Sequence, residues 1–158
     1  MEDWLTVQRR ARPEGLALTF QGQSWNYAQL DEMTDEWCGR LRTLGLVPGD
    51  LLAVHLSNSP VYVGLIHAVA RLGCVLAPLN TRLTQTELAW QVERLGARWM
   101  VSDMLLSGSL AEWKSACTVI SPDELQTLPT LEFSRVPLDL ERLQAIVFTS
   151  GTSGAPKG

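Results

Sequence analysis

Lysine is scarce in this 158-residue chain, and the chain has no excess of positive charge. Its 13 lysine and arginine residues stand against 17 aspartate and glutamate residues, which gives a formal net charge of -4. Lys114 and Lys157 are the two lysines of the sequence. Because nucleic-acid binding depends on a basic surface that displaces counterions, this balance argues against DNA or RNA as a partner.

Cysteine pairs and secretion signals are also missing. Cys38, Cys74 and Cys117 are far apart and form no C-x-x-C motif, so neither a disulfide framework nor a metal site is expected. We interpret them as small buried hydrophobic residues of a protein in the reducing cytoplasm. The first residues are acidic and lead into no apolar run, so the sequence predicts no signal peptide.

No apolar run is long and uninterrupted enough to predict a membrane span. The most hydrophobic stretch, residues 61–79, contains His67, Arg71, Gly73 and Pro78. Its pattern changes at Gly73 and therefore predicts a buried helix followed by a buried strand. With 46% hydrophobic residues, a chain of this length can form a core without disulfides or metal.

Hydrophobic periodicity and capping residues predict an α/β fold. The predicted helices cover residues 3–12, 27–44, 61–72 and 85–95, with short elements at 113–116 and after Ser121. The predicted strands cover residues 16–20, 24–27, 51–56, 74–78, 98–102, 118–120 and 145–148, and residues 127–137 are predicted as a surface loop. Strands and helices alternate between residues 51 and 102, which requires right-handed crossovers. The sequence therefore predicts a mostly parallel sheet with helices on both faces.

Several polar residues in the predicted elements invite a functional interpretation, but each has a simpler structural one. His55 lies in a strand and His67 in an apolar helix, so both are interpreted as structural histidines. Arg71 is expected to cap the C-terminus of its helix. The helix at 27–44 carries an acidic cluster that is interpreted as its solvated face. The cluster consists of Asp31, Glu32, Asp35 and Glu36.

The last predicted strand runs into a loop rich in glycine and hydroxyl residues. Residues 149–158 read Thr-Ser-Gly-Thr-Ser-Gly-Ala-Pro-Lys-Gly. Glycines let backbone N–H groups approach an anion, hydroxyls add donors and a lysine adds a point charge, so the loop suits a polyphosphate. A Walker A motif would need glycine at Pro156 and serine or threonine at Gly158, and a hydrolase elbow would need glycine at Ala155. By composition alone, a plain turn or linker stays open.

The segment from Phe148 to Gly158 resembles the signature loop of the AMP-forming adenylating enzymes, which include acyl-CoA synthetases, luciferases and peptide-synthetase adenylation domains. Residues 25–30, 46–50 and 70–80 are similar to earlier motifs of that family, in the same order and spacing. Residues 78–91 look more like acyl-CoA synthetases than peptide-synthetase domains. They resemble in particular the 2-succinylbenzoate ligases of menaquinone and phylloquinone synthesis.

This resemblance implies that residues 1–158 are the N-terminal part of an AMP-binding domain that ends in a phosphate-binding loop at 148–158. In the family, a carboxylate is joined to the α-phosphate of ATP and is then transferred to the thiol of coenzyme A. The implied ligands are ATP, Mg²⁺, coenzyme A and a small carboxylate. The residues implied to contact phosphate are Thr149 and Ser150 at the rim, Gly151, Thr152, Ser153 and Gly154 around the β- and γ-phosphates, and Lys157 as the cation.

The family's adenine, ribose and Mg²⁺ sites and its catalytic lysine follow this loop, so no catalytic or metal-binding residue is assigned here. We therefore expect an N-terminal fragment of a ligase that is inactive alone. Two alternatives stay open at the level of sequence. One is a stand-alone phosphate-binding module, and the other is an interaction domain that uses a sheet edge and the apolar helix at 61–72.

Overall fold

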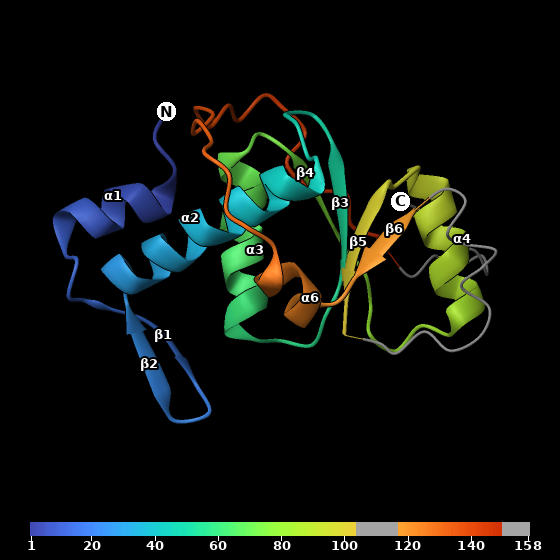
Figure 1. The fold of residues 1–158 in the computed structure, drawn as a ribbon, viewed down its shortest axis with the longest axis horizontal. Coiled ribbons are helices and arrows are strands. Elements are labelled where there is room, and N and C mark those ends of the chain that lie inside the picture. Colours follow the sequence, from blue (N-terminus) through green and yellow to red (C-terminus); the bar gives the residue numbers. More distant parts are fainter. Residues whose placement is uncertain (104–116, 150–158) are drawn as a thin grey trace.

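The computed structural model describes residues 1–103 and 117–149 (Figure 1). These residues form a four-stranded sheet covered by helices on both faces, and a separate two-stranded hairpin. The helices are α1 (Trp4–Ala11), α2 (Tyr27–Leu44), α3 (Pro60–Arg71), α4 (Gln85–Leu95) and α6 (Pro122–Thr127). The strands are β1 (Leu16–Phe20), β2 (Gln23–Asn26), β3 (Leu51–His55), β4 (Val75–Pro78), β5 (Trp99–Ser102) and β6 (Thr118–Ile120). Among the helices of these residues, none is long and apolar enough to cross a membrane.

The four-stranded sheet has the order β4-β3-β5-β6, and every pair in it is parallel. Helix α3 connects β3 to β4, and helix α4 connects β4 to β5. The predicted parallel sheet is thus confirmed, and all four strands end at the same edge. The predicted element at 113–116 lies outside the described residues.

Side chains that alternate along the strands pack into two separate hydrophobic cores, one on each face of the sheet. Leu52 and Val54 of β3 pack with α2 and α3 on one face of the sheet. Ala53, between them, packs on the other face with Leu88 and Val92 of α4. Figure 1 shows α2, α3 and α6 on one side of the sheet and α4 on the other. A strand buried on both faces explains the continuous apolar run in the sequence.

Capping residues set the helix boundaries as predicted. The Asn26 side chain accepts a hydrogen bond from the N–H of Gln29, 2.8 Å away. In return, Oε1 of Gln29 accepts a hydrogen bond from the N–H of Asn26, 2.9 Å away. Thr84 forms the same reciprocal pair with Glu87. Gly45 ends α2 in the left-handed conformation with φ 103°, which glycine adopts without a steric penalty.

The interpretation of the acidic cluster as a solvated face is wrong for Asp31, and Arg71 is more than a helix cap. Both side chains are fully buried. Arg71 donates to the Asp31 carboxylate and, over 2.7 Å, to Asp35, and it also contacts Asp3 of the α1 N-cap at 3.4 Å. The Asp31 carboxylate also pairs with Arg9 at 3.1 Å. A charged residue on α2 is therefore buried because its partners come from α1 and α3.

The segment that follows α6 has no regular structure, as predicted, but it is held against the helices. Arg135 donates to Asp35 over 2.6 Å and to Asp31 over 3.2 Å, so the segment joins the same ion-pair network. The N–H of Val136 donates to the carbonyl of Arg71 over 2.7 Å. This anchoring leads the chain across the helical layer toward β4.

The predicted strand at 145–148 is reduced to one parallel bridge. Ala145 pairs with Leu76 of β4, and the hydrogen bonds are Leu76 N–H to Gln144 O at 3.0 Å and Ile146 N–H to Leu76 O at 2.9 Å. The segment therefore runs beside β4 and in the same direction. Its end reaches the edge of the sheet where the strands end.

Candidate functional site

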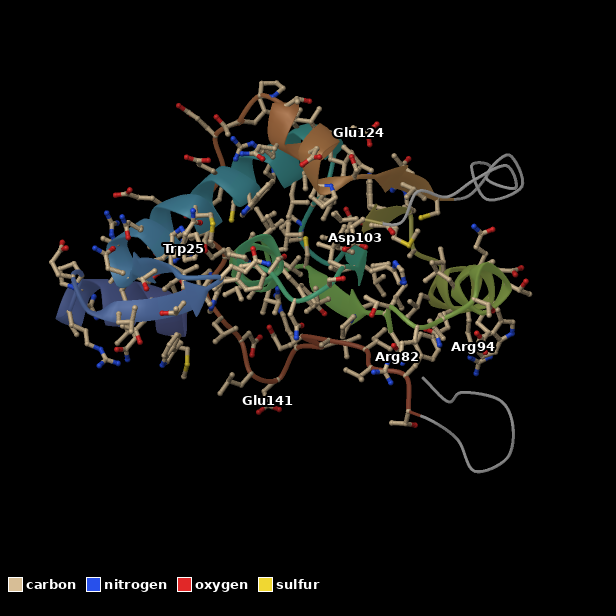
Figure 2. All side chains as sticks on the ribbon, turned by 90° about the horizontal axis from the view of Figure 1, so that it is seen from below. Trp25, Arg82, Arg94, Asp103, Glu124 and Glu141 are labelled. Carbon is tan, nitrogen blue, oxygen red and sulfur yellow. The ribbon has the colours of Figure 1, made fainter. Side chains whose placement is uncertain are left out.

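Polar residues gather at the edge where the parallel strands end. His55 closes β3, Ser102 closes β5, and Asn80 follows β4. Thr149 follows the segment that runs beside β4. Figure 2 labels Asp103, which comes directly after β5. In open parallel sheets this edge is the usual place for ligands, because loops and helix N-termini meet there.

A pocket of about 360 Å³ opens at this edge, between β4, α4 and the segment beside β4. Its lining is mostly apolar. The lining residues are Pro78, Leu79, Asn80, Leu83, Gln91, Val147, Phe148 and Thr149. An apolar pocket with a few polar groups is the common form of a small-molecule site.

Gln91 of α4 is the buried polar group of this pocket. It is 4% exposed and lines the pocket. Beside it on α4, Trp90 contacts Phe148 with ring centroids 6.2 Å apart, and Arg94 lies over the Trp90 ring at 5.5 Å. The contact between Trp90 and Phe148 joins the segment beside β4 to α4.

His55 is buried, as predicted, but only one of its two ring nitrogens has a hydrogen-bond partner among the described residues. Its Nδ1 lies 3.1 Å from Ser102 Oγ, and its buried Nε2 has no hydrogen-bond partner among the described residues. Burial lowers the pKa of the imidazole below its ordinary value, against the opposing effects of Asp103 and the backbone of Asn80. His55 is therefore neutral near pH 7. His67, the other predicted structural histidine, stacks on Trp4 at 6.2 Å.

Of the predicted phosphate contacts, Thr149 is described. It is exposed and lines the pocket at the edge of the sheet. Ser150, Gly151, Thr152, Ser153, Gly154 and Lys157 lie outside the described residues. The structure thus positions the start of the predicted loop, and the roles of its residues stay predictions.

The burial of Gln91 was not predicted from the sequence, although the periodicity of its helix carried a signal. Gln91 is three residues after Leu88 and one before Val92, so it lies on the stripe that faces the sheet. Its polarity alone suggested exposure. A polar residue inside an apolar stripe is the pattern that could have identified it.

The cysteines and acidic residues provide no metal site in the part of the chain that is described. No group of three or more histidine, cysteine, aspartate or glutamate side chains there could hold an ion. All three cysteines are free and buried. Burial raises the pKa of Cys38 to about 12 and the pKa values of Cys74 and Cys117 to about 11, so these thiols are protonated and inert, as expected of small hydrophobic residues.

Comparison with known proteins finds related sequences over the whole chain. The family described as AMP-binding enzyme matches residues 5–158. A 2-succinylbenzoate--CoA ligase of Geobacillus kaustophilus is 34% identical over 159 residues, which cover 100% of this chain and 32% of that protein. The chain therefore spans about a third of the length of this curated relative, and a ligase of the same name from Listeria monocytogenes shows 32% identity with 33% of its length covered.

Solved structures agree with these relatives. The o-succinylbenzoate CoA synthetase of Bacillus subtilis in complex with the acyl-adenylate intermediate superimposes with a TM-score of 0.91 at 28% identity, covering 100% of this chain and 41% of that one. The same enzyme in complex with ATP and magnesium ion gives a TM-score of 0.89 at 26% identity, covering 100% of this chain and 42% of that one. The predicted α/β class is confirmed by this likeness.

Proposed function

The chain belongs to the AMP-binding enzyme family, and on this premise we propose that it is part of an ATP-dependent ligase that activates a carboxylate as an acyl-adenylate and transfers the acyl group to coenzyme A. The observation that carries the proposal is the position of Thr149. This residue stands at the edge where the parallel strands end, beside a pocket, and the glycine-rich segment follows it directly. Phosphates bind at such edges in other open α/β sheets.

The chemistry of the first step explains why this loop is needed. A carboxylate oxygen forms a bond to the α-phosphorus of ATP while the bond to the departing pyrophosphate breaks. Both reactants are anions, so donors must neutralise phosphate oxygens as charge moves onto pyrophosphate. We assign that role to the backbone and hydroxyls of residues 151–154, with Thr149 and Ser150 at the rim and Lys157 as the cation. Pro156 stiffens the approach to Lys157.

ATP would arrive with Mg²⁺, as in the solved Bacillus subtilis complex. The described residues hold no cluster that could bind the ion, so they do not fit a magnesium site of their own. In the second step, the thiol sulfur of coenzyme A forms a bond to the acyl carbon and AMP leaves.

The carboxylate that we propose is 2-succinylbenzoate. The support is the name shared by relatives from Geobacillus and Listeria, since no described residue distinguishes one carboxylate from another. We also propose a cytoplasmic location, because the free buried cysteines suit a reducing compartment.

A chimaera tests this proposal. Residues 1–158 replace the matching third of the Geobacillus kaustophilus ligase, and pyrophosphate release is measured with ATP, Mg²⁺ and 2-succinylbenzoate. We expect release that requires both substrates. In the chimaera, Lys157→Ala should lower kcat/KM by about 10²- to 10³-fold, because one donor to the developing charge is lost.

Lys114→Ala is the matched control, since it removes the other lysine of the chain. It should leave kcat/KM within about twofold, as expected of a residue without a proposed contact. A folded chimaera that releases no pyrophosphate would overturn the proposal. So would equal losses from the two lysine substitutions.

A further inference from the structure

The segment beside β4 forms an open edge of the parallel sheet. Leu76 of β4 donates its N–H to the carbonyl of Gln144 and accepts a hydrogen bond from the N–H of Ile146. Because backbone groups of successive residues in an extended chain point to opposite sides, those of Ala145 and Val147 point away from β4. In the part of the chain that the structure describes, no strand pairs with that outer side. Backbone donors and acceptors are therefore available there to a further strand.

The same segment exposes apolar side chains on the face of the sheet that α3 covers. Ala145 is paired with Leu76, which packs on the core formed with α2 and α3, so both side chains face that side. By alternation along the chain, Leu143 and Val147 face it too. Leu143 is 61% exposed and Val147 is 59% exposed. The described helices thus leave this part of the face uncovered.

The sequence of this edge is that of an interior strand. Residues 143–148 read Leu-Gln-Ala-Ile-Val-Phe and contain no charged residue and no proline. Edge strands are usually protected by charges, by proline or by short length, and β6 at the opposite edge is three residues long. A continuous apolar run is instead typical of a parallel strand that is buried on both faces. We therefore expect a partner on the outer side of this segment.

One supersecondary unit fits both open surfaces. Helix α3 lies in the connection from β3 to β4 and covers the face that bears Leu52 and Val54. A connection from residues 145–148 to a further parallel strand at the outer edge moves in the same direction across the sheet. Because such connections are right-handed, its helix passes over the same face as α3 and covers Leu143 and Val147. A strand and the helix before it thus match the open edge and the exposed side chains together.

The relatives contain additional chain that can supply this unit. The 158 residues cover 32% of the Geobacillus kaustophilus ligase and 41% of the Bacillus subtilis synthetase chain, so most of each chain has no counterpart here. We propose that residues 143–148 form the interface with a strand and a helix from the rest of an AMP-binding ligase. The identity of this partner rests on the proposed function. The surface itself is one that no step of the proposed reaction uses.

Hydrogen exchange of single backbone amides tests the strand pairing. Exchange is followed by mass spectrometry at residue resolution in the 158-residue chain and in the chimaera with the Geobacillus ligase. The outward N–H groups of Ala145 and Val147 should exchange at least about 100-fold more slowly in the chimaera, because they gain hydrogen-bond partners. The N–H of Ile146 is the matched control. It is bonded to Leu76 and should be protected in the 158-residue chain already.

A lysine substitution tests the side-chain contact. In the chimaera, Leu143→Lys places a charge under the proposed helix and should lower the midpoint of thermal unfolding by at least about 5 °C. In the 158-residue chain this side chain is exposed, so the midpoint should change by less than about 2 °C. Leu131→Lys is the matched control, because Leu131 is 53% exposed and its N–H donates to Gly39 of α2. It should change neither midpoint by more than about 2 °C.

The outcomes separate this proposal from its rivals. If the 158-residue chain does not unfold cooperatively, or the Leu143→Lys chimaera does not fold, the comparison with Leu131→Lys inside the chimaera decides. Equal exchange of the outward amides in the two proteins would overturn the proposal, as would equal effects of the two lysine substitutions in the chimaera. Protection of these amides in the 158-residue chain alone, with a dimer in analytical ultracentrifugation, would assign the edge to a second copy and reject the ligase partner.

The interface and the proposed activity fail separately. A folded chimaera that protects the outward amides but releases no pyrophosphate would overturn the proposed function and leave the interface standing. An active chimaera with unprotected amides would overturn the interface and leave the function standing.

Discussion

The two faces of the central sheet treat buried polar groups in opposite ways. On the side covered by α2 and α3, the guanidinium of Arg71 is surrounded by Asp3, Asp31 and Asp35. The Asp31 carboxylate is paired in turn with Arg9. On the α4 side, the Nε2 of His55 is buried without a hydrogen-bond partner among the described residues. Complete polar networks fix the fold, and incomplete ones are where a ligand can supply the missing bond.

The side of the sheet covered by α2 and α3 has one exception to this completeness. The Nε1 of Trp37 is buried without a partner in the described residues. A Cβ on Gly64 of α3 would lie 2.9 Å from this nitrogen, so the indole is packed directly on the α3 backbone. No ligand can reach it.

The largest effect should come from breaking the complete network. Asp31→Ala leaves Arg71 buried without its closest carboxylate, which should lower the free energy of unfolding by about 3 to 5 kcal/mol. Urea unfolding followed by circular dichroism measures the change. Glu36→Ala removes an exposed pair with Arg40 on the same helix and should cost about 1 kcal/mol or less. Similar losses from both substitutions would show that the buried network is no more important than a surface pair.

A smaller effect should come from filling the close contact between α2 and α3. Gly64→Ala places a Cβ 2.7 Å from Cδ1 of Trp37, which forces the helices apart and should cost about 1 to 3 kcal/mol. Adding Trp37→Leu should recover part of that cost, because the smaller side chain makes room for the methyl group. Strictly additive losses in urea unfolding would mean that the two residues do not meet.

These contacts mark the limit of what the sequence predicts. Helix starts at Asn26 and Thr84 were predictable because their capping partners are three residues away. The burial of Asp31 was not, because its partner Arg71 is 40 residues further along the chain and a charged residue is usually exposed. Asp31 does share a helical stripe with Thr34 and Cys38, whose burial is a signal that polarity concealed.

The candidate site also has one part that could be predicted from the sequence and one part that could not. The position of Thr149 at the strand ends followed from an apolar run leading into a loop, although that run forms one bridge instead of a strand. The pocket did not follow from the sequence, because it depends on how α4 packs beside residues 147–149. Motifs reveal chemistry that is local in the chain, while cavities arise from tertiary packing.

The pH dependence of stability probes His55 on the α4 side. Because burial lowers its folded pKa, the unfolded chain binds more protons, and stability is complete above the ordinary histidine pKa and decreases as the pH falls below it. We expect His55→Gln to make the loss of stability between about pH 6.5 and pH 5 shallower in urea unfolding. Glu93→Gln, an exposed change on α4, should leave the slope unaltered. An unchanged slope in His55→Gln would contradict a neutral buried imidazole.

The smallest effect should come from replacing Gln91, the buried polar residue of the pocket at the strand ends. Gln91→Met replaces a polar side chain on the buried stripe of α4 with an apolar one of similar length, so the free energy of unfolding should stay within about 1 kcal/mol of the natural value or rise. Urea unfolding at pH 7 tests this directly against Asp31→Ala. A loss of several kcal/mol would mean that Gln91 serves the fold as Asp31 does. A neutral result would mean that the fold does not depend on the Gln91 carboxamide, in contrast to the carboxylate of Asp31, because only the carboxylate has a buried charge to pair with.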